Sequence, residues 1–159
     1  MGIEIERKFL LASDGWRQHV EKTLEMRQGY LSRDAQSSVR VRICGEQADI
    51  NIKSTRDGIH RLEYEYAIPM EDAQELMKHV AHRPVIEKKR HIVHIGRHCW
   101  EIDEFYGENE GLVVAEVELE AVDEPYERPD WLGREVSTDA RYYNSNLSKL
   151  PYKYWKDEA

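Results

Sequence analysis

The sequence predicts a mainly β protein of the α+β class, in which eight antiparallel strands close into a barrel with helices at its periphery. Eight runs of residues predict strands, and seven of them alternate between charged and apolar side chains with the period of two that is typical of a β-strand. The positions on the non-apolar face of these strands are nearly all Arg, Lys, Asp or Glu, whereas an exposed sheet face usually carries a mixture of polar residues. Eight antiparallel strands are also the number that closes into a barrel able to hold one small ligand.

The first run, residues 3–11, shows the alternation most clearly. Glu4, Glu6 and Lys8 are two residues apart, so their side chains share one face of the predicted strand. Seven further runs predict strands, at residues 26–32, 37–44, 48–54, 60–68, 85–95, 98–105 and 112–121. Residues 26–32 are the weaker candidate, and the other six runs repeat the alternation. Gly96 and Arg97 stand between two of these runs and predict a tight two-residue hairpin.

Three segments predict helices. Residues 14–24 follow Ser13, which is a suitable N-cap. Residues 70–82 place one apolar stripe on a single helical face, formed by Ala73, Leu76, Met77 and Val80. The tail, residues 139–156, is mixed, and residues 144–149 are its strongest helical turn. We expect the aromatic side chains of this tail to pack over the apolar outside of the barrel.

Composition narrows the class of protein. A chain of 159 residues without a linker or repeat predicts one domain, residues 1–159. The net charge of −8 argues against a nucleic-acid partner. The chain shows no apolar run near 18 residues and no signal-peptide pattern, so we expect no membrane partner. Cys44 and Cys99 are isolated, which favours reduced thiols and a cytoplasmic location. The oligomeric state stays open, with a homodimer as one option.

The charged faces indicate a kind of ligand. An open sheet with a hydrated face would explain any one of these strands. If all the faces point into a barrel, however, burying so many charges costs several kcal/mol per ion unless each is paired, hydrated or bound to a ligand. Arginine forks match phosphate oxygens, whereas Mg²⁺ and Mn²⁺ prefer carboxylate oxygens. The combination therefore favours a site for a polyanion with metal ions, as in phosphoryl transfer.

These charged runs resemble a known family. The segment from Glu4 to Lys8, Glu-Ile-Glu-Arg-Lys, is similar to the ExExK signature of the triphosphate tunnel metalloenzymes, also called the CYTH superfamily. Later elements resemble the family in their order along the chain: Arg40-Val-Arg42, Lys53, Glu63-Tyr-Glu65, Lys88-Lys-Arg90, Asp103 and Glu116-Val-Glu118. Gln28-Gly-Tyr30-Leu is similar to the short bacterial branch, which is associated with hydrolysis of inorganic triphosphate.

The resemblance implies a barrel that encloses a tunnel, a triphosphate substrate and Mg²⁺ or Mn²⁺ as cofactor. It implies a phosphate-binding group formed by Lys8, Arg40, Arg42, Lys53, Arg61, Lys88 and Arg90. It implies a metal-binding group formed by Glu4, Glu6, Asp103, Glu116 and Glu118, with Glu63, Glu65 and Tyr30 in supporting positions. Lys8, Arg42 and Glu118 are the candidate catalytic residues, and the sequence leaves open whether Glu118 or Glu116 serves as the base.

We therefore expect a divalent-metal-dependent hydrolase of inorganic triphosphate, with nucleoside triphosphates as further substrates to test. The alternatives are a class IV type adenylate cyclase, a thiamine triphosphatase and a non-catalytic module that binds polyphosphate. The acidic and aromatic segment of the cyclase and thiamine triphosphatase branches is not found in this sequence. The carboxylates argue against a pure binding module, because binding an anion gains nothing from them.

Overall fold

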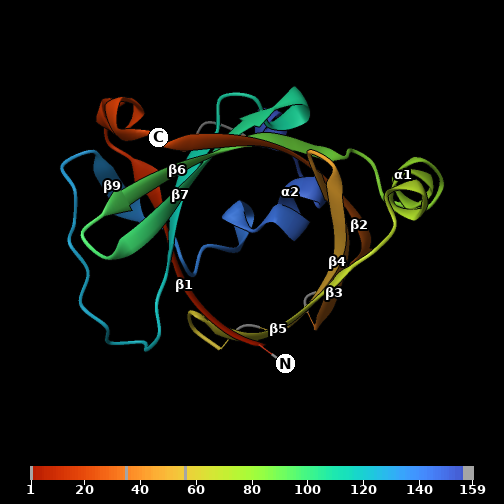
Figure 1. Cartoon of the computed structure of the whole chain (residues 1–159), viewed down its shortest axis with the longest axis horizontal. Helices are drawn as coiled ribbons and strands as arrows, with labels where there is room; N and C mark the ends of the chain where they lie inside the picture. The colour runs from red at the N-terminus through yellow and green to blue at the C-terminus, as the bar shows by residue number, and fades with distance from the viewer. Residues whose placement is uncertain (1, 35, 56, 156–159) are drawn as a thin grey trace.

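Eight antiparallel strands form a closed barrel in the computed structural model, which describes residues 2–34, 36–55 and 57–155. The strands are β1 (Gly2–Leu11), β2 (Lys22–Arg33), β3 (Ser37–Cys44), β4 (Gln47–Ser54), β5 (His60–Ala67), β6 (Ile86–Ile95), β7 (His98–Tyr106) and β8 (Val113–Glu118). Their order around the ring is β1-β5-β4-β3-β2-β6-β7-β8, and β8 pairs again with β1. Figure 1 looks along the barrel and shows the ring. The predicted eight-stranded antiparallel barrel is confirmed.

The first strand closes the ring by dividing its pairing between neighbours. Residues 2–5 pair with β5, and residues 6–10 pair with β8. A ninth strand, β9 (Leu132–Glu135), pairs with the end of β1 and was not predicted, because its four residues carry no alternation. Gly133 permits the approach of β9: a β-carbon there would lie 2.8 Å from the carbonyl oxygen of Leu10.

The predicted helix at residues 14–24 is wrong. The structure has a short 3-10 helix, η1 (Gly15–His19), and then β2 from Lys22 onward. Two effects override the helical signal. Trp16 is fully buried in an apolar cluster with Phe9 and Trp100, here called the outer core, which lies on the outside of the barrel wall. Residues 22–28 form a regular antiparallel pair with β6. A tertiary strand pair of seven residues thus outweighs a weak helical propensity.

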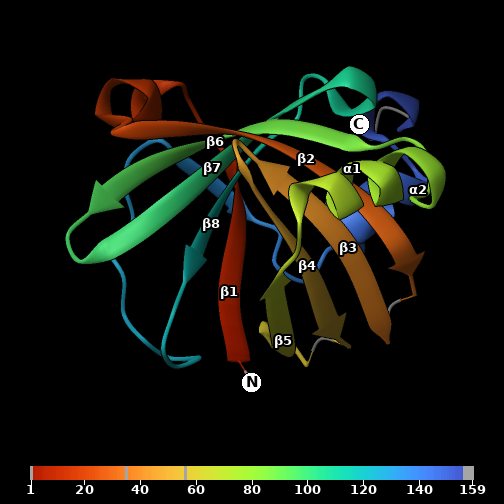
Figure 2. The same ribbon diagram turned by 45° about the vertical axis from the view of Figure 1, so that its right-hand side comes forward.

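The helix predicted at residues 70–82 is confirmed, but it is shorter, as α1 (Met70–His79). It lies on the outer surface of the barrel, as Figure 2 shows, and buries Ala73 and Met77 against Val41 of β3. Val80 does not belong to the buried stripe, since its side chain is 56% exposed. No helix among the described residues is long and apolar enough to cross a membrane.

The tail fills one end of the barrel instead of covering its outside, so our expectation for its packing is wrong. It forms η3 (Ala140–Tyr142), α2 (Asn144–Lys149) and η4 (Tyr152–Tyr154), and a further short 3-10 helix, η2 (Gly107–Asn109), follows β7. Leu147 of α2 is fully buried in one cluster with Ile86 and Phe105. Ile86 shares a strand face with Lys88, and Phe105 shares one with Asp103. The inward face is therefore apolar at this end, and α2 covers it.

The outer core explains why the charges face inward. Phe9, Trp100, Ile102 and Val117 alternate with the charged positions of β1, β7 and β8, and all four are buried in one cluster. Trp131, from the segment that precedes β9, covers this cluster from outside. Burial of large apolar side chains on the outside therefore fixes the register that turns the charged faces toward the lumen.

Candidate functional site

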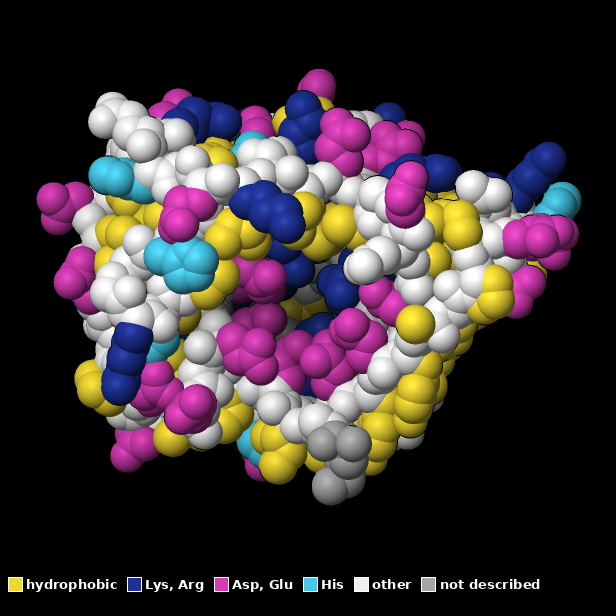
Figure 3. Space-filling view, viewed as in Figure 1, with side chains coloured by type: hydrophobic (Ala, Val, Ile, Leu, Met, Phe, Trp, Pro, Cys, Tyr) yellow, Lys and Arg dark blue, Asp and Glu magenta, His cyan; other side chains and the backbone are white. Residues whose placement is uncertain are grey.

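The barrel encloses a cavity of about 180 Å³ whose walls are almost entirely charged or polar. Every strand from β1 to β8 contributes to it, and Figure 3 shows acidic side chains gathered at the opening with basic ones inside. The lining includes fourteen of the fifteen residues singled out in the sequence: Glu4, Glu6, Lys8, Tyr30, Arg40, Arg42, Lys53, Arg61, Glu63, Glu65, Lys88, Arg90, Glu116 and Glu118. Asp103 is the exception and lies behind the wall.

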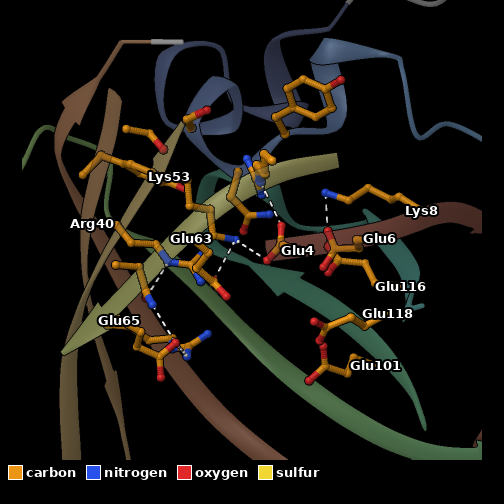
Figure 4. A pocket seen from close by; sticks show the side chains of 18 of the residues that line it. Glu4, Glu6, Lys8, Arg40, Lys53, Glu63, Glu65, Glu101, Glu116 and Glu118 are labelled. Carbon is orange, nitrogen blue, oxygen red and sulfur yellow. Dashed lines mark hydrogen bonds and ion pairs between the residues drawn. The ribbon is translucent and has the colours of Figure 1, made fainter. Parts of the chain in front are cut away.

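Glu4 is held between two cations. Its Oε1 accepts a hydrogen bond from Arg61 Nε at 2.8 Å, and its Oε2 accepts one from Lys53 Nζ at 3.1 Å. Burial alone would raise the pKa of Glu4, but the charges of Lys53 and Arg61 outweigh it and lower the pKa to about 2. Glu4 is thus ionised near neutral pH and ties β1 to β4 and β5 (Figure 4).

Asp103 supports two cations from beneath the cavity wall. It is fully buried, and its Oδ2 accepts a hydrogen bond from Lys88 Nζ at 2.7 Å. Arg90 donates to both of its oxygens, at 2.8 Å from Nε and 3.0 Å from Nη2. Burial would raise the pKa of Asp103, but Arg90 and Lys88 lower it. Burial also lowers the pKa of Lys88, to about 7, against the opposing attraction of Asp103.

A second group of basic side chains lies on β3 and β4. Arg40 Nε donates to Asn51 Oδ1 at 3.1 Å, and Asn51 Nδ2 donates to Glu65 Oε2 at 2.7 Å. Arg42 has looser partners, Asp49 at 3.7 Å and Glu65 at 3.6 Å. Burial, and then the nearby charge of Arg40, lower the pKa of Arg42. Because its carboxylate partners lie beyond hydrogen-bond distance, the Arg42 fork has donors to offer an anion.

The opposite wall gathers four carboxylates on three neighbouring strands. Glu6 of β1 is the cross-strand partner of Glu118 of β8, and Glu116 of β8 is the partner of Glu101 of β7. Burial and the nearby charges of Glu116 and Glu4 raise the pKa of Glu6 to about 8. Burial, followed by neighbouring acids, also raises the pKa of Glu118. This set, called the acid wall below, carries more negative charge than its neighbours neutralise.

Glu116 has closer cationic support than Glu101, whose Oε2 lies 3.3 Å from Arg90 Nη1. Lys8 Nζ lies 3.1 Å from its Oε1, and Lys8 also donates to the backbone oxygen of Tyr142 at 3.0 Å. Burial would raise the pKa of Glu116, but Lys8 and Arg90 lower it well below its usual range. A hydrogen bond from Glu6 contributes in the same direction.

The donor chemistry of the acid wall fits a hard divalent cation. Mg²⁺ and Mn²⁺ bind carboxylate oxygens, and a cation would offset the burial and the repulsion between acids that raise the pKa values of Glu6, Glu101 and Glu118. Within residues 2–34, 36–55 and 57–155, no three acids already converge in a metal-binding group. The side chains on this wall would therefore have to move closer together around an ion.

Six further residues line the cavity without having been assigned to the site from the sequence: Ser38, Asn51, Glu101, Tyr143, Asn144 and Ser145. Asn51 and Glu101 follow the same alternation as their neighbours, so the strand pattern could have identified them. The three residues from the tail carried no such signal. Tyr143, Asn144 and Ser145 reach the cavity only because the tail folds into the end of the barrel.

Fold and site together define a barrel protein whose charged lumen suits a polyanion and a cation. The CYTH domain family model matches residues 2–154, and the chain belongs to this family, as the resemblance in the sequence implied. It is 47% identical over 157 residues to a protein named inorganic triphosphatase from Acetivibrio thermocellus, covering 99% of this chain and 100% of that relative. A protein of the same name from Nitrosomonas europaea is 35% identical over 151 residues, covering 91% and 96%. The crystal structure of an inorganic triphosphatase, 33% identical, matches with a TM-score of 0.64 over 91% of this chain and 97% of that one.

Proposed function

We propose that this protein hydrolyses inorganic triphosphate in the barrel lumen and that the reaction requires Mg²⁺ or Mn²⁺. The observation that carries the proposal is the division of one small cavity into cationic walls and an acid wall. A triphosphate is a short chain of anionic groups and needs cations along its length. The names of the two relatives, at 47% and 35% identity over nearly their full lengths, support the same substrate.

The basic side chains would bind and orient the phosphate chain. Arg40 and Arg42 come from β3, and Lys53 and Arg61 from β4 and β5, so they form one continuous wall. Lys8, Lys88 and Arg90 lie on β1 and β6 and complete the group. Fixed cations that face the leaving diphosphate stabilise the charge that develops on it. We assign Lys8 and Arg42 to this catalytic role.

The acids Glu6, Glu116 and Glu118 would hold the metal, with Glu4 beside them. When bound, the metal would neutralise phosphate charge and lower the pKa of a coordinated water. Glu118 is our candidate proton acceptor, because its raised pKa suits a base, whereas Glu116 is paired with Lys8. Asp103, whose oxygens already face Lys88 and Arg90, would position these cations instead of binding metal.

Nucleotide substrates have less support. Among the described lining residues, only Tyr30 and Tyr143 are aromatic, so the lumen offers little surface for stacking a base. We therefore propose that inorganic triphosphate is preferred over nucleoside triphosphates and thiamine triphosphate, and that cyclisation of ATP is not the main reaction. The orthophosphate released from the three substrates, with Mg²⁺, with Mn²⁺ and with excess chelator, tests this order. Faster cyclic AMP formation or full activity in chelator would reject it.

We also propose a cytoplasmic location, which the free thiols of Cys44 and Cys99 support because exported proteins tend to pair their cysteines. The homodimer stays a prediction, and light scattering coupled to size-exclusion chromatography measures it directly. A mass near 18.8 kDa would indicate a monomer.

A further inference from the structure

The tail brings one neutral amide, that of Asn144 on α2, into the cavity beside the phosphate-binding lysines. Asn144 Oδ1 accepts two hydrogen bonds, from Gln28 Nε2 at 3.1 Å and from Lys88 Nζ at 3.2 Å. Gln28 is fully buried on β2, and Lys88 is buried on β6. Asn144 is therefore held by two strands of the barrel through a single oxygen atom.

These contacts fix which way the amide faces. Lys88 Nζ donates to Asn144, so the atom of Asn144 that faces Lys88 is its oxygen. The Nδ2 group then lies on the other side of the planar amide and makes no hydrogen bond with any residue that the structure describes. Asn144 lines the cavity, so two N–H donors are left for whatever enters it.

Gln28 supports this orientation. Its Nε2 donates to Asn144, while its own buried Oε1 has no partner within the described part of the chain. Reversing the Asn144 amide alone would set its Nδ2 against two donors, Gln28 Nε2 and Lys88 Nζ. The arrangement thus holds the Asn144 oxygen on Gln28 and Lys88 and turns its nitrogen away from both, in a residue that lines the cavity.

We propose that Asn144 is a substrate-binding residue, which donates from Nδ2 to a terminal phosphoryl group of triphosphate at the end of the lumen that α2 closes. This inference rests on the proposed function for the identity of the substrate. A terminal phosphoryl group without an ester has three oxygens to accept such donors. Lys88, Lys8 and Asn144 together surround that end with two cations and one neutral donor.

Two substitutions separate a binding role from a purely structural one. Asn144→Ala removes both the acceptor toward the wall and the donor toward the lumen. Asn144→Asp keeps the acceptor for Gln28 and Lys88 but replaces the donor with a negative charge that faces the substrate. If Asn144 only anchored α2, the Ala variant would lose stability but would still bind triphosphate as the wild type does. If it binds phosphate, the Asp variant must be weaker than the Ala variant.

The control is Asn146→Ala, on the same helix. Asn146 Nδ2 donates to the backbone oxygen of Ala140 at 2.8 Å, and Asn146 does not line the cavity. This change weakens the docking of α2 without touching the lumen. We expect it to leave triphosphate affinity within about twofold of the wild type.

The measurement is the dissociation constant of triphosphate in excess chelator, by calorimetry, together with kcat and KM in Mg²⁺. Loss of a hydrogen bond to a charged group predicts about 10- to 100-fold weaker binding for Asn144→Ala and a larger loss for Asn144→Asp. Asn144→Ser, which keeps a shorter donor, replaces the Ala or Asp variant in the measurement if that variant unfolds at a lower temperature than the wild type. Affinity unchanged in Ala and Ser, or an Asp variant that binds better than Ala, would overturn the proposal. Wild-type binding without hydrolysis would reject only the proposed reaction, and wild type that binds no triphosphate would reject both.

Discussion

Glu6 lies directly opposite Glu118 where β1 pairs with β8, so two carboxylates share one stretch of the cavity wall. Like charges opposite each other destabilise a strand pair, and burial adds to the cost. Burial and other nearby acids raise the pKa of both groups: Glu116 and Glu4 add to the effect of burial on Glu6, whose pKa is about 8, and Glu4 and Glu63 add to it on Glu118. A sequence under selection for stability alone would not keep this pair, which is why we assign the wall to a cation.

Metal affinity should rise with pH. A raised pKa means that Glu6 holds its proton near neutral pH, and metal must displace that proton to bind. Between pH 6 and pH 9 the group ionises, so the apparent affinity for Mg²⁺ should increase. Mg²⁺ dependence of triphosphate hydrolysis at several pH values measures this, and an affinity that stays flat or falls would count against the acid wall as the metal site.

The metal-free protein should lose stability between about pH 4.5 and about pH 8. The folded pKa of Glu6 lies above its ordinary value of 4.5, so the folded state binds more protons than the unfolded state between these pKa values. The stability that Glu6 contributes is therefore complete below about pH 4.5 and is lost as pH rises through about 8. Urea unfolding of the chelated protein should show the decline, and Glu6→Gln should remove part of it.

Glu6→Ala should lower kcat and raise the Mg²⁺ concentration needed for half-maximal activity, because it removes a candidate ligand. It should not unfold the protein, since it also removes a repulsion. Glu75→Ala, at an exposed position on α1, is the matched control and should change neither quantity. An unaltered metal requirement in Glu6→Ala would remove Glu6 from the site.

Arg42→Ala should weaken triphosphate binding by about 10- to 100-fold, as expected when a charged donor worth about 1.5–3 kcal/mol is lost. Its carboxylate partners lie at 3.6 and 3.7 Å, so little native structure depends on it. Arg17→Ala removes an arginine that pairs with Glu104 away from the cavity and serves as control. Loss of the fold in Arg42→Ala would mean that Arg42 is a structural ion-pair member.

Asp103→Asn should reduce stability and leave the Mg²⁺ requirement unchanged. Lys88 and Asp103 are both fully buried, and breaking a buried ion pair from one side costs about 3–5 kcal/mol. Urea unfolding measures the loss, and Mg²⁺ titration of the remaining activity measures the requirement. A stable variant that needs much more metal would return Asp103 to the metal-binding group.

Strand alternation predicted which residues share a face, and the resemblance to the CYTH family completed the prediction of a closed barrel and of its lumen. A period of two assigns each residue to a face, and the outward burial of residues such as Trp100 leaves the charged positions no other direction. The same logic placed Glu4, Arg40 and Lys88 in one cavity although they lie far apart in the sequence. Residues that are far apart in the sequence could be assigned to one cavity from their alternation, because strand geometry is regular.

The rest depended on contacts that no local pattern encodes. Asp103 carries the alternation of a lumen residue, but the cations of Lys88 and Arg90 draw its carboxylate beneath the wall. Asn144 gave no signal, because its place in the site follows from α2 covering an apolar end of the barrel. The residues from Lys22 onward are compatible with a helix, so the start of β2 is recognised only from its pairing with β6.

A crystal structure of the protein with triphosphate and Mn²⁺ tests the central claim most directly, because anomalous scattering locates the metal independently of the substrate. We predict a Mn²⁺ peak beside Glu6, Glu116 and Glu118, with the phosphate chain along Arg40, Arg42 and Lys53. Triphosphate bound outside the barrel, or Mn²⁺ bound away from the acid wall, would contradict the assignment of the lumen as the active site.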